Sequence, residues 1–89
     1  MHAISYSRFG PPNEVLAACE IPTPDPGPGE VLVRLHVSGV NPSDAKARAG
    51  ARPGVTKPAF PRVVPHSDGA GVIEAVGDGV PAARIGTRV

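Results

Sequence analysis

Apolar and polar residues alternate along one stretch in the middle of the chain, residues 30–37 (EVLVRLHV). The apolar positions are Val31, Val33, Leu35 and Val37. A period of two is typical of a β-strand with one buried face, so we predict a half-buried strand here. Residues 2–6 and 14–21 predict two shorter strands that pair as a hairpin across residues 9–13, and residues 69–76 predict a fourth strand.

Proline and glycine separate these predicted strands. Residues 21–29 (IPTPDPGPG) form a stiff connector, because proline removes ladder donors and imposes turns. A short helix is expected after this point, since Asn41 can cap a helix, Pro42 has the φ of a first turn, and Gly50 stops the helical run. Residues 51–62 predict a loop. Short strands with one brief helix favour a mainly β fold, a small and partly open barrel.

Composition narrows the class of protein. The chain has 89 residues, enough for one small domain and too few for a two-domain enzyme. Its apolar fraction of 40% supports a packed core, and its net charge of +1 does not demand a polyanionic partner. Aromatic residues are only 3%, so stacking platforms for nucleic-acid bases are scarce. Wholesale nucleic-acid binding is therefore not expected.

Charge is unevenly distributed along the chain. Residues 45–67 contain five Lys or Arg and no acid, and residues 9–33 contain four acids and no Lys or Arg. The basic stretch is compatible with binding of an anionic ligand. It is equally compatible with a solvent-exposed loop whose positive charge is offset by the acidic stretch. RNA binding through residues 46–62 is a weaker alternative.

Cysteine content and the ends of the chain bear on location. The single Cys19 excludes an internal disulfide and suits a reducing compartment, so we expect a cytoplasmic protein. The first six residues do not resemble a signal peptide, and no apolar run approaches the roughly 18 residues of a membrane helix. The last residues, Arg88 and Val89, look like the opening of a further strand, so we expect the chain to be the front part of a longer protein.

Three familiar chemical motifs fit poorly. The run Gly69-Ala70-Gly71 lacks the following helix that a dinucleotide fingerprint needs, so its small residues are better explained by close backbone approach. Adjacent residues such as His66, Ser67 and Asp68 diverge in an extended chain and cannot form a hydrolytic triad. The spacing of Cys19, His36 and His66 does not match a zinc site, so no metal site is expected.

Two polar clusters remain as candidates for chemistry. The first is Asn41-Pro42-Ser43-Asp44, where a predicted strand becomes a helix, and the second is residues 65–68 (PHSD). Helix capping alone explains Asn41 and Asp44, and satisfying turn amides explains Asp68. The presence of both clusters in one short chain favours a functional site.

The order of motifs resembles a known family. The segments PGEVLVRL (28–35), GVNPSD (39–44) and PHSDGAGVIEAVG (65–77) resemble the N-terminal catalytic segment of quinone oxidoreductases, which belong to the medium-chain dehydrogenase/reductase superfamily. The resemblance covers essentially the whole chain. It implies that residues 1–89 are an incomplete GroES-like catalytic domain, with a cofactor-binding Rossmann domain absent from this chain.

The resemblance also implies an absence of catalytic zinc. Where zinc-dependent alcohol dehydrogenases of the superfamily place a Cys ligand this chain has Asn41, where they place a His ligand it has Ser67, and Asp68 stands at their Glu. A ketone or alcohol benefits from a Lewis acid, whereas a quinone or enone is already electrophilic. Loss of zinc therefore favours a conjugated acceptor.

By the same resemblance, Asn41, Pro42 and Ser43 border the nicotinamide and substrate pocket. Asn41 and Ser43 would act as catalytic hydrogen-bond donors to the acceptor's carbonyl oxygen, with Asp68 orienting neighbouring groups. Cofactor contacts in this chain would come from Asn41 and Pro42. Quinone oxidoreductases often carry a Tyr near the position of Lys46, so substrate contacts from such a phenol are not expected here.

The resulting expectation is an NADPH-dependent, zinc-independent reductase of quinones or α,β-unsaturated carbonyls, a homodimer at full length and inactive as these 89 residues alone. NADPH would be bound mainly by the missing domain, because the chain has no phosphate cradle of its own. The alternative from another class is a free-standing GroES-like binding or chaperone module, for which this length is adequate.

Overall fold

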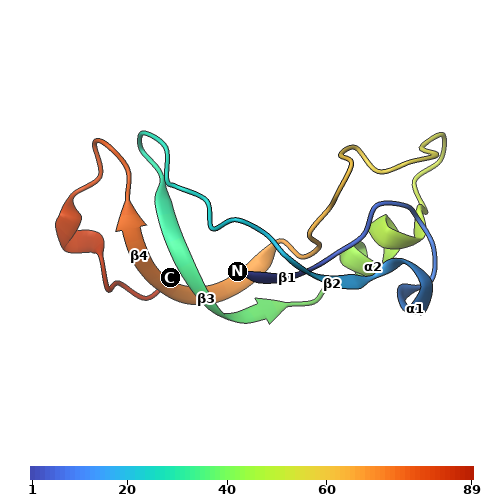
Figure 1. The fold of residues 1–89 in the computed structure, drawn as a ribbon, viewed down its shortest axis with the longest axis horizontal. Helices are drawn as coiled ribbons and strands as arrows, with labels where there is room; N and C mark the ends of the chain where they lie inside the picture. Colours follow the sequence, from blue (N-terminus) through green and yellow to red (C-terminus); the bar gives the residue numbers. More distant parts are fainter. The chain divides into compact units, whose positions relative to one another are not determined.

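The computed structural model describes all residues, 1–89, and shows a mainly β chain (Figure 1). The elements in order are β1 (His2–Ser5), α1 (Pro12–Val15), β2 (Ala17–Glu20), β3 (Val31–Gly39), α2 (Pro42–Ala49), β4 (Asp68–Val76) and the 3-10 turn η1 (Ala82–Arg84). The chain divides into two compact units. Unit 1 contains Met1–Pro22 and Val40–Ser67, and unit 2 contains Thr23–Gly39 and Asp68–Val89.

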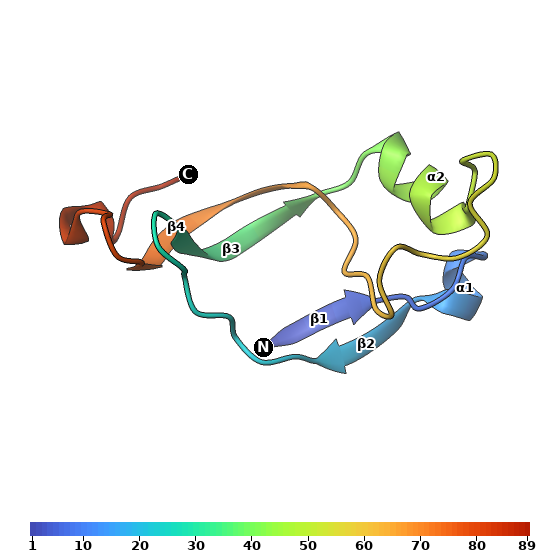
Figure 2. The ribbon, with the colours of Figure 1, turned by 90° about the horizontal axis from the view of Figure 1, so that it is seen from above.

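Unit 1 is built on the hairpin of β1 and β2, which lie side by side and antiparallel (Figure 2). The predicted pairing of these two strands is confirmed. Immediately after β1, the backbone groups of Tyr6 and Val63 exchange two hydrogen bonds of 2.9 Å, which joins the long loop after α2 to the hairpin. The core of this unit is small, with Tyr6 and Val15 as its buried apolar side chains.

The second predicted strand was too long. Residues 12–15 form the short helix α1, and only Ala17–Glu20 are extended. Pro11 precedes this helix and Pro12 starts it, and the carbonyl of Pro11 accepts from the N–H groups of Glu14 and Val15. A short apolar run has no period that separates strand from helix, and here the helical turn buries Val15.

The predicted helix is confirmed as α2. Gly50 ends it with φ of +75°, the left-handed conformation that glycine adopts at helix ends. A Cβ on Gly50 would lie 2.6 Å from the Phe9 ring, so glycine is also needed for packing. Arg48 ties α2 to the loop after β1, since its carbonyl accepts from the N–H of Gly10 and its guanidinium donates to the carbonyl of Gly10.

Unit 2 contains β3 and β4, the two longest strands, paired antiparallel. The predicted clean alternation along β3 is broken by two bulges. Glu74 is an extra residue on β4 between the pairs of Leu32 and Val33, and His36 is an extra residue on β3 between Leu35 and Val37. Each bulge shifts the pairing by one residue and re-aims the side chains beyond it.

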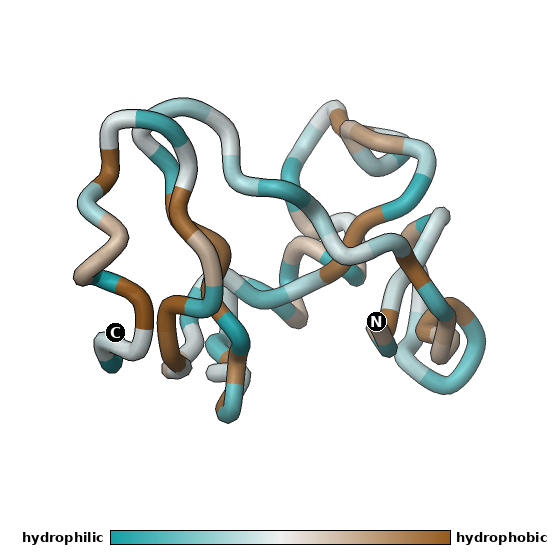
Figure 3. Tube along the Cα trace, turned by 60° about the vertical axis from the view of Figure 1, so that its left-hand side comes forward, coloured by the Kyte–Doolittle hydropathy of each residue, from teal (hydrophilic) through white to brown (hydrophobic).

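The predicted half-buried face of β3 is therefore only partly buried. Val33 is half-buried, whereas Leu35 and Val37 are each 61% exposed. The sheet has two strands, which offer little area for burying a whole apolar face. Figure 3 shows the apolar residues interspersed with polar ones along the chain.

Close backbone approach explains the glycines of β4. A Cβ on Gly71 would lie 2.1 Å from the carbonyl oxygen of Arg34 on β3. On the other edge of β4, Gly71 and Val89 exchange two backbone hydrogen bonds, 2.9 and 3.0 Å long, so the last residues run beside this strand. Ile73, two residues on, is the most deeply buried side chain at 1% exposure.

None of the helices has the length and apolar character needed to cross a membrane.

We predict that Gly71→Ala weakens the pairing of β3 and β4. The added methyl group would meet a backbone carbonyl that cannot rotate away, and such overpacking costs about 1–3 kcal/mol of unfolding free energy. Denaturant unfolding of the purified protein measures this change. A comparison variant is Gly29→Ala, where φ is +74° and no atom lies within 4 Å of the new Cβ, so that its loss of stability reports conformational strain alone. Unchanged stability of Gly71→Ala would contradict close approach as the role of Gly71.

Candidate functional site

The first candidate residue, Asn41, begins α2. Its backbone is extended, with φ of −122° and ψ of 158°, and its N–H donates to a carboxylate oxygen of Asp44 at 2.7 Å. In return, the Asn41 side chain accepts from the backbone N–H of Asp44, which completes a capping box. The capping role expected for Asn41 and Asp44 is confirmed, and it holds the Asn41 side chain at the start of the helix.

Pro42 and Ser43 follow in the first turn of α2, and both are exposed. Pro42 lacks an N–H, which suits a first turn whose N–H groups have no partner within the helix. The helix dipole adds partial positive charge at this end. The carboxamide of Asn41 and the hydroxyl of Ser43 are thus hydrogen-bonding groups at a helix end that favours a partner with negative charge.

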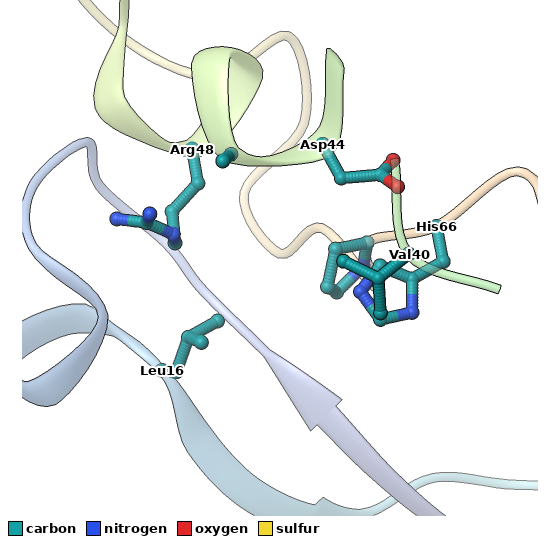
Figure 4. A pocket seen from close by; sticks show the side chains of 7 residues that line it. Leu16, Val40, Asp44, Arg48 and His66 are labelled. Atoms are coloured by element: carbon teal, nitrogen blue, oxygen red, sulfur yellow. The ribbon is translucent and has the colours of Figure 1, made fainter. Parts of the chain in front are cut away.

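An open hollow of about 160 Å³ lies beside this turn, within unit 1 (Figure 4). Its lining residues are Leu16, Val40, Asp44, Ala45, Arg48, Pro65 and His66. Val40 directly precedes Asn41, and His66 comes from the second polar cluster. The structure therefore brings residues 65–66 of the second cluster to the same hollow as residues that flank Asn41.

His66 has an unusual backbone conformation. Its φ is +83°, and it is the one residue other than glycine with a positive φ. The left-handed region costs a residue with a Cβ about 1–2 kcal/mol. His66 lines the hollow together with Val40 and Asp44 (Figure 4).

Asp68, the other predicted catalytic residue, belongs to unit 2. It is exposed and is the first residue of β4, where it pairs with Gly39 at the end of β3. The grouping of Asp68 with Asn41 and Ser43 stays a prediction.

The residues weighed for metal or dinucleotide binding are dispersed. Cys19 lies on β2 in unit 1, half-buried with its sulfur 3.4 Å from the Ser5 hydroxyl, whereas His36 is the bulged residue of β3 in unit 2. Within neither unit do three His, Cys, Asp or Glu side chains gather as a metal site. Gly69 and Gly71 lie inside β4 against β3, which confirms close approach as the reason for small residues there.

Sequence reasoning missed Leu16 and Arg48 as lining residues of the hollow. Arg48 was detectable, because it lies four residues after Asp44 and such pairs share one face of a helix. Leu16 comes from the link between α1 and β2, and its place depends on a helical turn that periodicity did not indicate.

Comparison with protein families identifies the class. The model of the alcohol dehydrogenase GroES-like domain matches residues 27–89. The chain belongs to this family. Its expected fold class, mainly β and GroES-like, is thereby confirmed.

Several similar relatives are quinone oxidoreductases, which belong to the medium-chain superfamily. Quinone oxidoreductase of Rattus norvegicus is 42% identical over 89 residues, which are 100% of this chain and 26% of that protein. The solved structure of Escherichia coli quinone oxidoreductase complexed with NADPH has 32% identity and a TM-score of 0.83, covering 99% of this chain and 26% of that one. The chain thus spans about a quarter of the length of these relatives.

A metal-binding protein is equally similar in structure. The cobalt and zinc bound thermostable alcohol dehydrogenase from Pyrobaculum aerophilum has 43% identity and a TM-score of 0.82, covering 100% of this chain and 25% of that one. Overall similarity therefore does not separate quinone oxidoreductases from metal-bound alcohol dehydrogenases, and the distinction depends on individual residues.

We predict that Asp44→Ala frays the first turn of α2. The substitution removes the carboxylate that accepts from the Asn41 N–H, and loss of a capping interaction costs about 1 kcal/mol. Hydrogen exchange measures the effect, with faster exchange expected at the amide of Asn41. Lys46→Ala, an exposed change on the same helix, is the control and should leave that exchange rate unchanged. Equal rates in wild type and Asp44→Ala would refute the capping box.

Proposed function

We propose that this chain is the catalytic-domain portion of an NADPH-dependent oxidoreductase that transfers hydride to a quinone or an α,β-unsaturated carbonyl without zinc. The coarser part, an oxidoreductase of the medium-chain superfamily, is supported by the family match and by relatives that include quinone oxidoreductases. The substrate class and the independence from zinc rest on this chain's own residues.

One observation carries the proposal, namely the residue types at positions 41 and 67. By the resemblance of the two motifs, Asn41 and Ser67 stand where zinc-dependent alcohol dehydrogenases place Cys and His. Zinc in proteins is bound mainly by thiolate, imidazole and carboxylate groups, and a neutral carboxamide or hydroxyl is a poor substitute. Asn41 is also engaged in the capping box of α2. The donor set therefore does not fit a catalytic zinc, and the proposed reaction uses none.

This chain offers a place for the nicotinamide ring of the cofactor but not for the cofactor's phosphates. The exposed first turn of α2, with Asn41, Pro42 and Ser43, suits contact with a polar ring. The phosphates do not fit this chain, because the glycines of β4 lie against the backbone of β3 and no helix begins there. When bound, NADPH supplies a hydride, and residues outside this chain would hold its phosphates.

The chain's own contribution is to stabilise charge on the acceptor. Negative charge develops on the carbonyl oxygen of the acceptor as hydride adds, and fixed hydrogen-bond donors aimed at that oxygen lower the barrier. The capping bond engages the oxygen of the Asn41 carboxamide, and the NH₂ group is the hydrogen-bond donor of this side chain. The hydroxyl of Ser43 is a second donor in the same turn.

This arrangement favours an acceptor that needs modest stabilisation. A quinone or enone delocalises the incoming charge, so one or two neutral donors suffice, whereas an isolated ketone gains more from a Lewis acid. Conjugated acceptors are therefore the substrate class proposed.

The first test compares substrate classes in the full-length protein. We expect oxidation of NADPH with duroquinone, whose fully substituted ring has no C–H position at which the Cys19 thiol could add and form a stable aryl adduct, and no reduction of NADP with a simple alcohol. Absorbance of NADPH follows both reactions. Alcohol turnover that requires zinc, with no quinone reduction, would overturn the proposal.

A second test replaces Asn41 by Asp in the full-length protein. Aspartate caps a helix as well as asparagine does, so α2 should persist, but the NH₂ donor is lost and a negative charge faces the developing oxyanion. Loss of one such donor costs about 10²-fold in kcat, and we expect at least this reduction with duroquinone. Circular dichroism checks that the fold is retained. Unchanged kcat in a folded Asn41→Asp variant would remove Asn41 from the catalytic group.

A further inference from the structure

Two arginine residues of unit 2 lie on one face of its sheet. Arg34 on β3 pairs with Val72 on β4, and on the other edge of β4 the same Val72 pairs with Arg88. Directly paired residues of antiparallel strands point to the same face. Neighbouring strands lie about 4.8 Å apart, so the Cα atoms of the two arginines are separated by roughly 10 Å across Val72. Both long side chains can therefore reach one group placed over Val72.

Neither guanidinium has a partner within the chain. The side chains of Arg34 and Arg88 are exposed and make no hydrogen bond or ion pair. Of the acids on β4, Glu74 is a bulged residue that makes no ion pair, and Asp68 lies four residues before Val72, about 13 Å along the strand. Like charges on one sheet face repel each other, so this arrangement does not stabilise the fold. Two positive charges are available to an external anion.

The number of charges restricts the class of anion. A guanidinium binds carboxylate or phosphate oxygens through two parallel N–H donors. A carboxylate carries one negative charge, whereas a phosphate monoester carries about −1.5 to −2 near pH 7. Two guanidiniums therefore match the charge of a phosphate monoester better than that of a single carboxylate.

The neighbouring positions on this face are apolar. Ala70 lies two residues before Val72 on β4 and hence on the same face, and it pairs with Val37 on β3. Val37 and Ala70 are exposed, and Val72 is half-buried. These three residues form an apolar strip that begins between the two arginines. An apolar group attached to the phosphate would lose its contact with water on this strip.

We propose that this face of unit 2 binds a soluble phosphate monoester that carries an apolar group. The phosphoryl oxygens accept hydrogen bonds from Arg34 and Arg88, and the apolar group packs on Ala70 and Val37. None of these residues is among those proposed for hydride transfer, so this inference does not depend on the proposed function. The ligand is a second molecule beside NADPH, and the two bind at the same time.

The test is isothermal titration calorimetry of the full-length protein with phenyl phosphate. NADPH is kept at saturation, so that the groups that bind the cofactor's own phosphates are occupied. We expect Arg34→Gln and Arg88→Gln each to weaken binding about tenfold, because each loses charge-assisted hydrogen bonds. Arg84→Gln removes an exposed arginine of η1 in the same unit and should leave the affinity unchanged. Unchanged affinity in Arg34→Gln and Arg88→Gln, or no binding to the wild type, would overturn the proposal.

A further variant tests the apolar strip. Val37→Ala should weaken binding of phenyl phosphate severalfold and leave binding of inorganic phosphate unchanged, because only the first ligand has a ring to pack on this residue. Thermal unfolding checks that every variant remains folded. Equal affinity of the wild type for the two ligands would refute the contact with the strip. Binding to vesicles of phosphatidic acid, with none to phenyl phosphate, would refute a soluble ligand.

Discussion

The hydrogen bond from the Asn41 N–H to the Asp44 carboxylate, 2.7 Å long, determines where α2 begins. Because α2 begins there, Pro42 and Ser43 lie in an exposed first turn and Asp44 faces the hollow. The reciprocal bond engages the oxygen of the Asn41 carboxamide and holds this side chain at the start of the helix. A single capping box thus connects helix formation with the chemistry of the candidate site.

Glycine provides the other constraint on this fold. Gly71 allows the backbones of β3 and β4 to approach, and Gly50 allows α2 to end against the Phe9 ring. At these two positions a side chain would meet neighbouring atoms, and in both cases the neighbour comes from a segment distant in the sequence. His66 is the contrasting case, since its backbone is left-handed yet its side chain is retained.

The sequence predicted the features whose causes are local. The start and end of α2 follow from Asn41, Pro42 and Gly50, and each acts within a few residues. The extent of the second strand was wrong at residues 14–16, because a short apolar run is compatible with a helical turn as well as a strand. The bulge at His36 and the left-handed φ of His66 depend on pairing and packing partners elsewhere in the chain. The local sequence pattern therefore did not predict them. The same is true of the place of Leu16 in the hollow.

The central claim is that Asn41 and Ser67 make a site without zinc in a family that also contains metal-bound members. The most direct measurement is equilibrium binding of Zn²⁺ by the full-length protein, compared with the same protein carrying Asn41→Ala and Ser67→Ala. The account predicts identical zinc stoichiometry and affinity for the two proteins. Wild-type protein that holds a zinc ion which the double variant loses would contradict it.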